Sequence, residues 1–296
     1  MSGSSAPPEE PSPAILSLPV ENGDELDPDG LDVVFSATES DVARAQEPRF
    51  AKTTAVVSTA SAFRYETDVP LLVPNVNMDH AALIRRQQAS RGWKGFVVPI
   101  PNCTVTGLVI TLKPLADAFG LGAAIVTSMN GLSGAGRSPG VMGLDILDNL
   151  IPFIPREEEK VQLECRKILP QHPAEISATC TRVNVLEGHT ESVFASLGVR
   201  ASVADVKHAL ESAPNEAREL GLPTAPAEWI KGARRPQPRR DRDNGQGMTT
   251  TVGRIREDNV LPNGVKYMLV SHNTRMGAAA GAVLVAEYLV VKGFIG

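Results

Sequence analysis

The chain has 296 residues, of which 42% are hydrophobic and 21% are charged, and its formal net charge is −5. This length and composition allow a sizeable buried core and, by the usual domain size, two domains. The mildly acidic balance excludes a general electrostatic attraction to nucleic acid. Three cysteines, Cys103, Cys165 and Cys180, give neither an even disulfide framework nor a zinc-ligand spacing. They predict a reducing, cytoplasmic compartment and no bound metal.

Neither a membrane span nor a secretory signal is predicted. No apolar run reaches the roughly 18 uncharged residues that cross a bilayer, and the N-terminus lacks the basic and apolar regions of a signal peptide. The longest apolar stretch, 277–291, is interrupted by Glu287 and predicts a buried core helix. The basic run 234–243 contains interleaved acidic residues. We interpret it as a surface loop, with a nuclear-localisation or nucleic-acid patch as the alternative.

The first part of the chain alternates short apolar strands with helices, as a parallel sheet requires. Residues 1–30 are acidic and rich in Pro and Ser, a composition typical of disorder. The strands predicted after them are 31–36, 54–58 and 95–99, and the predicted helices are 40–49 and 79–91. A further apolar segment begins at Leu71. These elements predict an α/β, Rossmann-like domain over residues 31–102.

The second part mixes strands and helices and predicts an α+β domain over residues 103–272. Its predicted strands are 123–128, 176–185, 191–197, 250–256 and 266–271, and its predicted helices are 104–119 and 202–212. The last helix, 274–291, belongs to a C-terminal segment, 273–296, that is expected to pack back on the first domain.

Cys103 is the first candidate catalytic residue. It follows the strand 95–99 and two prolines, and it opens the apolar helix 104–119. Backbone N–H groups and the positive dipole end at a helix start favour thiolate over thiol, and thiolate is the nucleophilic form. The alternative is a buried structural cysteine, since most free cysteines are buried and inert.

Five further motifs accompany Cys103. Arg182 and His189 are seven residues apart, on a strand and in the turn after it, and a glycine-rich loop covers 128–136. The other sequences are Arg-Glu-Glu-Glu-Lys at 156–160, Ala-Phe-Arg-Tyr-Glu-Thr-Asp-Val-Pro at 62–70 and Ser-His-Asn-Thr at 271–274. Together with Cys103 they resemble aspartate-semialdehyde dehydrogenase of the fungal and archaeal branch, from about residue 31 to the C-terminus.

The resemblance implies the reversible, NADP-dependent reduction of L-aspartyl-4-phosphate to L-aspartate 4-semialdehyde and phosphate, a step of amino-acid biosynthesis. Cys103 would form a thioester, and His189 would take the thiol proton and protonate the departing oxygen. The alternative for His189 is a cap of the turn. The resemblance also implies a homodimer or homotetramer formed by the second domain, and neither nucleic acid nor membrane as a partner.

The resemblance assigns the remaining site residues by position. Arg182 would bind the substrate α-carboxylate bidentately, and Glu157 would lie near the ammonium group. Arg64, Lys160 and Asn102 would bind the phosphate. Ser133, Gly134 and Asn273 would border the cofactor, and Asn130 would orient the substrate. The next two glutamates, 158 and 159, are predicted to be a solvated helix face.

Three departures from the family pattern bear on function. Asn130 stands where the family has glutamine, and Arg275 stands one position ahead of the family's arginine, which on a helix is a rotation of about 100°. A Gly-x-x-Gly-x-x-Gly phosphate loop is absent ahead of the first predicted strand. These departures favour one alternative function, a paralogue without cofactor binding that acts as partner, regulator or specialised enzyme. A second alternative is a related N-acetylglutamyl-phosphate reductase with the same thiol chemistry. A truncated gene model would also account for the absent loop.

Overall fold

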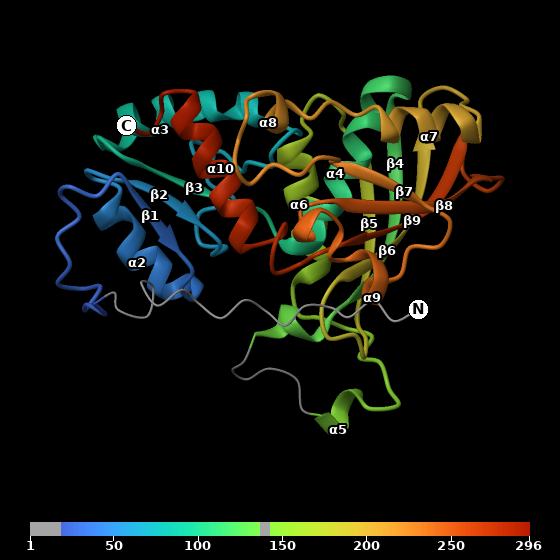
Figure 1. The fold of residues 1–296 in the computed structure, drawn as a ribbon, viewed down its shortest axis with the longest axis horizontal. Helices are drawn as coiled ribbons and strands as arrows, with labels where there is room; N and C mark the ends of the chain where they lie inside the picture. Colours follow the sequence, from blue (N-terminus) through green and yellow to red (C-terminus); the bar gives the residue numbers. More distant parts are fainter. Residues whose placement is uncertain (1–18, 137–142) are drawn as a thin grey trace.

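The computed structural model describes residues 19–136 and 143–296 and contains two sheets (Figure 1). The small sheet is parallel, with strand order β1-β2-β3, and the large sheet has the order β5-β4-β6-β9-β8-β7. The strands of the small sheet are β1 (Val33–Ser36), β2 (Ala55–Ser58) and β3 (Phe96–Pro99). This arrangement confirms the predicted α/β class, with a Rossmann-like part and an α+β part.

The small sheet forms because β2 and β3 are apolar runs that are buried along their whole length, the pattern of a parallel strand covered on both faces. Helix α2 (Ser40–Phe50) packs on this sheet, and a 3-10 helix (Met78–Ala82) leads into α3 (Leu83–Arg91). Gly92 ends α3 in the left-handed conformation that favours glycine, with φ of 66°.

The described part of the segment 1–30 contacts the first domain. Arg49 Nη1 donates to the carbonyl of Leu26 at 2.8 Å, and Thr54 Oγ1 donates to the carbonyl of Pro28 at 2.9 Å. Residues 19–30 thus differ from the disorder predicted from composition, because α2 and β2 supply partners for their backbone. Residues 1–18 lie outside the described residues.

The large sheet carries the second domain. Its strands are β4 (Leu121–Asn130), β5 (Glu175–Arg182), β6 (His189–Leu197), β7 (Ile230–Ala233), β8 (Thr250–Asp258) and β9 (Gly264–Ser271). β4 pairs in parallel with β5, where Asn130 is opposite Arg182, and antiparallel with β6. Placing His189 in a turn was wrong, because it is the first residue of β6 and pairs with Ser271 of β9. The C-terminal end of β5 and the N-terminal end of β6 therefore lie at the same end of the sheet, on either side of β4.

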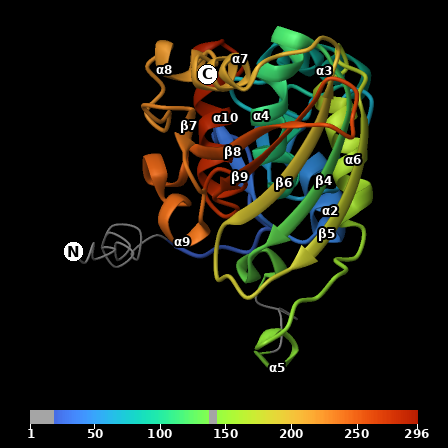
Figure 2. The same ribbon diagram turned by 90° about the vertical axis from the view of Figure 1, so that its right-hand side faces the viewer.

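Helices cover one face of the large sheet. They are α4 (Cys103–Phe119), α6 (Glu157–Ile168) and α7 (Val203–Glu211). The short elements of this part are α5 (Gly143–Ile146), which lies away from the sheet in Figure 1, α8 (Glu216–Glu219), α9 (Pro238–Asp241) and 3-10 turns at Leu132–Ala135 and Asn244–Gly247. Figure 2 shows β4, β5 and β6 in front, with α4 behind them. α4 is the central helix of the core, since apolar residues such as Leu108, Leu112 and Leu115 on it are fully buried.

Helix α10 (Ala279–Val291) packs against β2 and buries Leu284, Val285 and Leu289; in Figure 1 it lies between the two sheets. It begins five residues later than predicted. Residues 273–278 form turns instead, because Gly277 packs directly against α4: a Cβ at Gly277 would lie 2.7 Å from Cys103 Cβ.

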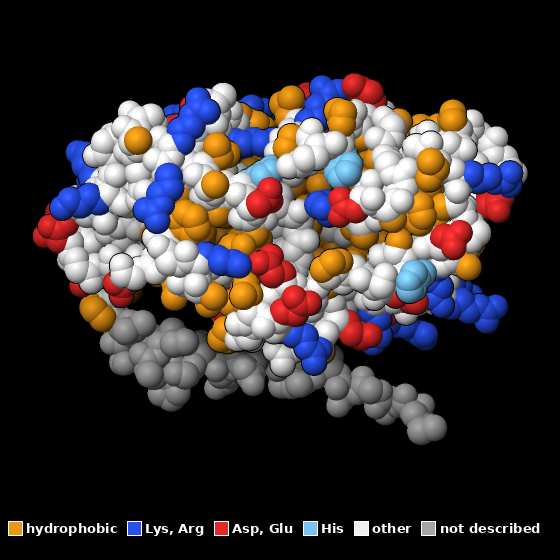
Figure 3. All heavy atoms as spheres, turned by 90° about the horizontal axis from the view of Figure 1, so that it is seen from above, with side chains coloured by type: hydrophobic (Ala, Val, Ile, Leu, Met, Phe, Trp, Pro, Cys, Tyr) orange, Lys and Arg blue, Asp and Glu red, His pale blue; other side chains and the backbone are white. Residues whose placement is uncertain are grey.

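Within residues 19–136 and 143–296, each helix is too short or too polar to cross a membrane. The face seen from above carries charged side chains of both signs, interspersed with apolar ones (Figure 3). An interspersed surface of this kind gives no extended field of one sign that would attract a polyanion.

Candidate active site

The active-site helix begins at a built N-cap. β3 ends at Pro99, and Asn102 caps α4 with its side-chain oxygen, which accepts from the backbone N–H of Thr104 at 2.8 Å and of Val105 at 3.4 Å. Such a cap satisfies the donors that a helix start leaves unpaired. Cys103 is consequently fixed as the first helical residue, at the point where the small sheet delivers the chain to the second domain.

His189 contacts the thiol from the neighbouring strand edge. Its Nε2 lies 3.1 Å from Cys103 Sγ, and its Nδ1 accepts the backbone N–H of Gly131 at 3.1 Å. A backbone N–H can only donate, so Nδ1 must carry a lone pair. The neutral imidazole then holds its proton on Nε2, directed at the sulfur.

The electrostatics of this pair differ from the expectation at a helix start. Burial and the nearby Glu157 raise the pKa of Cys103 to about 12, which outweighs the opposite effects of Arg64 and Arg182. Burial and Arg182 lower the pKa of His189 to about 3. The prediction that the helix N-terminus favours a resting thiolate is therefore wrong: the resting pair is a thiol and a neutral imidazole, because desolvation disfavours both charged forms.

Arg182 ends β5 and is buried beneath the glycine-rich loop. Its Nη1 donates to the carbonyl of Gly131 at 2.7 Å. Gly134 of the same loop lies against both Arg182 and His189, where a Cβ would be 2.9 Å from Nη1 and 3.1 Å from His189 Cε1. Only glycine allows the loop to approach these two side chains so closely.

Arg64 and Lys160 bring two positive charges near the thiol. Arg64 is 6% exposed, its Nη2 donates to the carbonyl of Thr59 at 2.8 Å and its Nη1 to Glu164 at 3.1 Å. Its Nε is buried and has no acceptor among the described residues. Lys160 Nζ lies 3.7 Å from Glu157 and is partly exposed. Both cations therefore line the cavity beside the thiol.

Glu157 lies behind the thiol and not on the solvated face. Its two oxygens accept from Asn102 Nδ2, each at 3.0 Å, and Oε1 also accepts from Thr104 Oγ1 at 3.1 Å. Asn130 is buried and donates to Thr104 Oγ1 at 3.1 Å. Of the two glutamates predicted to be solvated, Glu159 is exposed, whereas Glu158 accepts the backbone N–H of Cys180 at 3.0 Å.

Asn273 connects three segments of the site. Its side-chain oxygen accepts the backbone N–H of Gly188 at 2.8 Å, and its Nδ2 donates to Ser133 Oγ at 2.9 Å. The link joins the start of β6, the glycine-rich loop and the turn before α10. It therefore fixes the loop that carries Ser133 and Gly134 relative to His189.

A cavity of about 430 Å³ lies between the two domains. Seven predicted site residues line it: Arg64, Asn102, Cys103, Ser133, Gly134, Lys160 and Asn273. The other four are outside its lining. His189 and Glu157 hydrogen-bond to the lining residues Cys103 and Asn102. Arg182 packs against Gly134 of the lining, and Asn130 bonds to Thr104, which does not line the cavity. The cavity also reaches the ends of β1 and β2, where Thr38, Ser40 and Ser61 line it. The carboxyl ends of parallel strands are the usual place for a dinucleotide.

Sequence reasoning missed Glu164, which is fully buried and accepts from Arg64, Tyr65 and Asn102. The signal was its spacing of seven residues from Glu157, which places both carboxylates on one face of a helix. It also missed the hydroxyl groups of Thr38, Ser40 and Ser61, because polar residues in short loops carry no distinctive spacing.

Arg275 does not line the cavity. It is exposed, and its Nη1 donates to the carbonyl of Gln246 at 3.1 Å, while Met276 is buried. The argument from helical rotation does not apply, because both residues lie in the turns before α10. Ahead of β1, the described residues 19–32 contain no glycine-rich phosphate loop.

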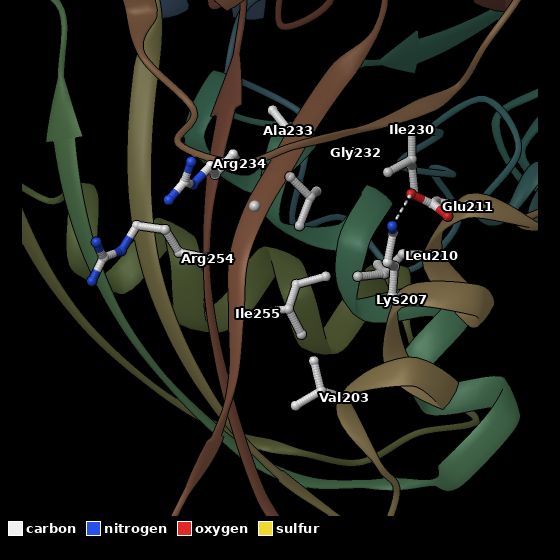
Figure 4. A pocket seen from close by; sticks show the side chains of 12 residues that line it. Val203, Lys207, Leu210, Glu211, Ile230, Gly232, Ala233, Arg234, Arg254 and Ile255 are labelled. Carbon is white, nitrogen blue, oxygen red and sulfur yellow. Dashed lines mark ion pairs between the residues drawn. The ribbon is translucent and has the colours of Figure 1, made fainter.

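A second hollow, of about 420 Å³, is lined by residues between 203 and 255, which are distant from Cys103 in sequence (Figure 4). None of the predicted site residues lines it. Val203, Leu210 and Ile255 give it an apolar lining, and Lys207 forms an ion pair with Glu211 at its edge. Arg234 of the basic run lines it beside the β7 edge strand. This hollow has no nucleophile or proton donor pair comparable to Cys103 and His189.

The chain matches two family models. Residues 6–84 match the semialdehyde dehydrogenase NAD binding domain, and residues 112–276 match the semialdehyde dehydrogenase dimerisation domain. The aspartate-semialdehyde dehydrogenase of Methanothermobacter thermautotrophicus is 44% identical over 279 residues, which cover 90% of this chain and 80% of that protein. The protein of the same name from Candida albicans is 43% identical over 289 residues, covering 89% and 79%.

Comparison with solved structures indicates the same family. The crystal structure of aspartate semialdehyde dehydrogenase with NADP from Candida albicans has a TM-score of 0.84 at 38% identity, covering 99% of this chain and 87% of that chain. Aspartate semialdehyde dehydrogenase II from Vibrio cholerae has a TM-score of 0.78 at 27% identity, covering 91% and 83%. The resemblance drawn from the motifs is confirmed: the chain belongs to the aspartate-semialdehyde dehydrogenase family.

Proposed function

We propose that this chain is an NADP-dependent aspartate-semialdehyde dehydrogenase that works through a thioester on Cys103. The observation that carries the proposal is the 3.1 Å contact between Cys103 Sγ and His189 Nε2, beside a cavity that Arg64 and Lys160 also line. A thiol, a proton donor and two cations around one cavity suit the interconversion of an aldehyde and an acyl phosphate. The names of the relatives support the same reaction.

The residues present fit the nicotinamide end of the cofactor. The cavity runs from Cys103 to the strand ends of the small sheet, and Ser133 and Asn273 border it with neutral polar groups. Ser133 and Asn273 would hold the nicotinamide side, and Thr38 and Ser61 the side toward the small sheet. When bound, NADP supplies the hydride acceptor, or as NADPH the hydride donor.

In the oxidative direction, Cys103 Sγ forms a bond to the aldehyde carbon while the carbonyl oxygen takes a proton. His189 Nε2–H is the donor at hand for that oxygen, and Nε2 regains a proton from the thiol, so the imidazole ends neutral. The hemithioacetal would then lose its hydride, for which bound NADP is the acceptor, and its hydroxyl proton to solvent, which leaves a thioester. A phosphate oxygen then attacks the thioester carbon, the C–S bond breaks and Cys103 is released together with the acyl phosphate.

Charge complementarity supports the assignment of substrate groups. Arg182 offers a planar guanidinium for the α-carboxylate, and Glu157 offers a carboxylate toward the ammonium group. Arg64 and Lys160 line the cavity and would bind phosphate with their positive charges. The buried carboxylate of Glu157 favours a substrate with a free ammonium group over an N-acetylated one, which argues against the N-acetylglutamyl-phosphate alternative.

The second domain supports self-association. The face of the large sheet opposite α4 exposes Ile125, at 47%, in register with Phe194 of β6. Phe194 is in turn in register with Lys266 of β9, whose ammonium lies over its ring. A row of two apolar side chains and one cation on an exposed sheet face suits a second copy of the chain, and we propose a homodimer through this face, in the cytoplasm.

One experiment tests the proposal and separates it from a paralogue without cofactor binding. NADP binding to the purified chain is measured by calorimetry, and phosphate-dependent NADP reduction with aspartate semialdehyde is measured in the same sample. Binding with turnover supports the dehydrogenase. Absence of binding, with Cys103 still reactive to an alkylating agent, contradicts it and favours the paralogue.

The matched variant is Cys103→Ser, with Cys180→Ser as the control for a buried thiol outside the cavity. We expect Cys103→Ser to lower turnover by at least about a thousandfold, as removal of a nucleophile does elsewhere. The control should retain turnover. Similar activities of Cys103→Ser and the wild type would contradict the thioester mechanism.

A further inference from the structure

We propose that Glu164 is a positioning residue for the phosphate step: it holds the phosphate-binding guanidinium and the segment that carries the thiol at a fixed separation. This inference rests on the proposed function. It assigns a role to a carboxylate that none of the sequence motifs singled out.

Glu164 contributes one oxygen to each side of the site. Its Oε2 accepts the backbone N–H of Asn102 at 2.6 Å, directly before Cys103. Its Oε1 accepts from Arg64 Nη1 at 3.1 Å and from the Tyr65 hydroxyl at 3.2 Å. A single carboxylate therefore connects the start of α4 to the loop after β2.

The carboxylate is fully buried, with 0% of its side chain exposed, and 7% of the Arg64 side chain is exposed. A buried ion pair of this kind is costly to desolvate and is retained only where its geometry is well satisfied. Four donors and acceptors are satisfied here: Nη1 and Nη2 of Arg64, and both oxygens of Glu164. The remaining Nε of Arg64 has no partner among the described residues.

This arrangement explains how Arg64 binds an anion without losing its orientation. Glu164 and the Thr59 carbonyl fix two of the three guanidinium nitrogens, so the plane of the group is set before phosphate arrives. The part of Arg64 that lines the cavity is left for phosphate. Because Asn102 is gripped on its backbone by Glu164 and on its side chain by Glu157, the thiol cannot move independently of Arg64. Phosphate would thus meet the thioester carbon at a distance that α6 sets.

The test is Glu164→Gln, with Glu159→Gln as the control on the exposed side of the same helix. The readouts are the KM for phosphate and the KM for semialdehyde in the oxidative direction. The Kd for inorganic phosphate is measured separately, from its slowing of Cys103 alkylation. We expect the phosphate constants to rise about tenfold or more, since a hydrogen bond to a charged group is lost, while the KM for semialdehyde stays within about twofold. The control should match the wild type.

A double-mutant cycle shows whether Glu164 acts through Arg64. In an Arg64→Gln background, Glu164→Gln should leave the phosphate constants unchanged; a further rise equal to that in the wild type would overturn the proposal. So would a folded Glu164→Gln with wild-type phosphate constants. If Glu164→Gln does not fold, Glu164→Asp carries the same test, because it keeps the buried charge but is too short to reach both partners.

The two proposals fail differently. A wild-type chain without phosphate-dependent turnover contradicts the proposed function. If the wild-type chain has that turnover, but Glu164→Gln leaves the KM and Kd for phosphate unchanged, only the positioning role is contradicted.

Discussion

At the scale of single residues, the orientation of one imidazole determines which proton transfers are available. His189 has its Nδ1 occupied by the Gly131 N–H and its proton on Nε2. To act as a base in the resting enzyme, His189 would have to take a proton on Nδ1. The resulting Nδ1–H of the imidazolium would then point at the N–H of Gly131, which is unfavourable. The geometry therefore makes His189 a donor toward sulfur or oxygen first, and an acceptor only after it has given its proton away.

This predicts the pH dependence of catalysis. Because the pKa of His189 is lowered to about 3, kcat/KM should show no ionisation near the ordinary histidine value of about 6.5. Because the neutral thiol and imidazole are the reacting pair, kcat/KM should stay flat between the ionisations of His189 and Cys103, and it should change only as the pH approaches the raised pKa of Cys103. The measurement is a pH profile of the wild type and of His189→Gln. An ionisation near neutral pH that disappears in His189→Gln would contradict the donor role.

The donor role of His189 also predicts which of two substitutions at this position costs more activity. Glutamine retains an N–H donor near the position of Nε2, whereas alanine retains none, so His189→Gln should keep at least about tenfold more activity than His189→Ala, the worth of roughly one hydrogen bond. Equal losses in turnover assays of the two variants would show that donation from this position is not what His189 contributes.

Glu191 makes stability depend on pH. It is fully buried on β6, and neither carboxylate oxygen has a partner among the described residues. Burial, reinforced by Glu157, raises its pKa well above the ordinary value. The unfolded chain ionises this group above about pH 4.3, so the folded state loses relative stability as pH rises from there toward the raised pKa.

Glu191→Gln removes that dependence. Relative to the wild type, its free energy of unfolding should gain up to about 1.4 kcal/mol for each pH unit in this window. The measurement is urea unfolding at about pH 5 and about pH 8, with Glu159→Gln as the exposed control. A difference from the wild type that stays constant with pH would contradict a protonated Glu191.

At the scale of elements, the loop 131–136 matters more than its composition suggests. Gly134 lies over Arg182 and His189, and an added methyl group would lie 2.9 Å from the guanidinium. Gly134→Ala should therefore displace the loop and lower kcat/KM for semialdehyde by about tenfold to a hundredfold, the cost of a misplacement near 1 Å. Steady-state kinetics check this, with Gly122→Ala as control, since its nearest neighbour is 3.8 Å away. Equal kinetics for both variants would contradict the close approach.

How far the sequence predicts the elements depends on how local their causes are. The strand, turn and helix that present Cys103 follow from apolar runs and two prolines, and the structure has them within one or two residues. The onset of α10 was missed because Gly277 contacts Cys103 across the fold, a contact that no local pattern encodes. The start of β6 at His189 is likewise set by pairing with Ser271.

The site shows the same division. The family resemblance carried by the motifs was enough to assign Cys103, Arg64 and Lys160 to one site, and the structure brings them to one cavity. The motifs could not give the protonation states, because burial and neighbouring charges set the pKa of Cys103. Nor could they show that Glu164 bridges Arg64 and Asn102, since that requires α6 to be placed between segments about sixty and a hundred residues away in sequence.

At the scale of the whole molecule, the uncovered face of the large sheet predicts the assembly. Ile125→Lys would place a charge in the row formed by Ile125, Phe194 and Lys266, next to an existing cation. We expect the variant to shift from dimer to monomer in sedimentation at micromolar concentration, because burying an unpaired charge costs several kcal/mol. Val260→Lys, at a site 88% exposed on another loop, is the control. An unchanged mass for Ile125→Lys would place the interface elsewhere.

The raised pKa of Cys103 has a consequence outside the catalytic cycle. Peroxide and other oxidants attack thiolate far more readily than thiol. A sulfur held as thiol at the cavity wall is therefore poorly reactive toward these oxidants while the enzyme waits for substrate, even though the cavity is open to solvent. The burial that makes the resting nucleophile weak also protects it from irreversible damage.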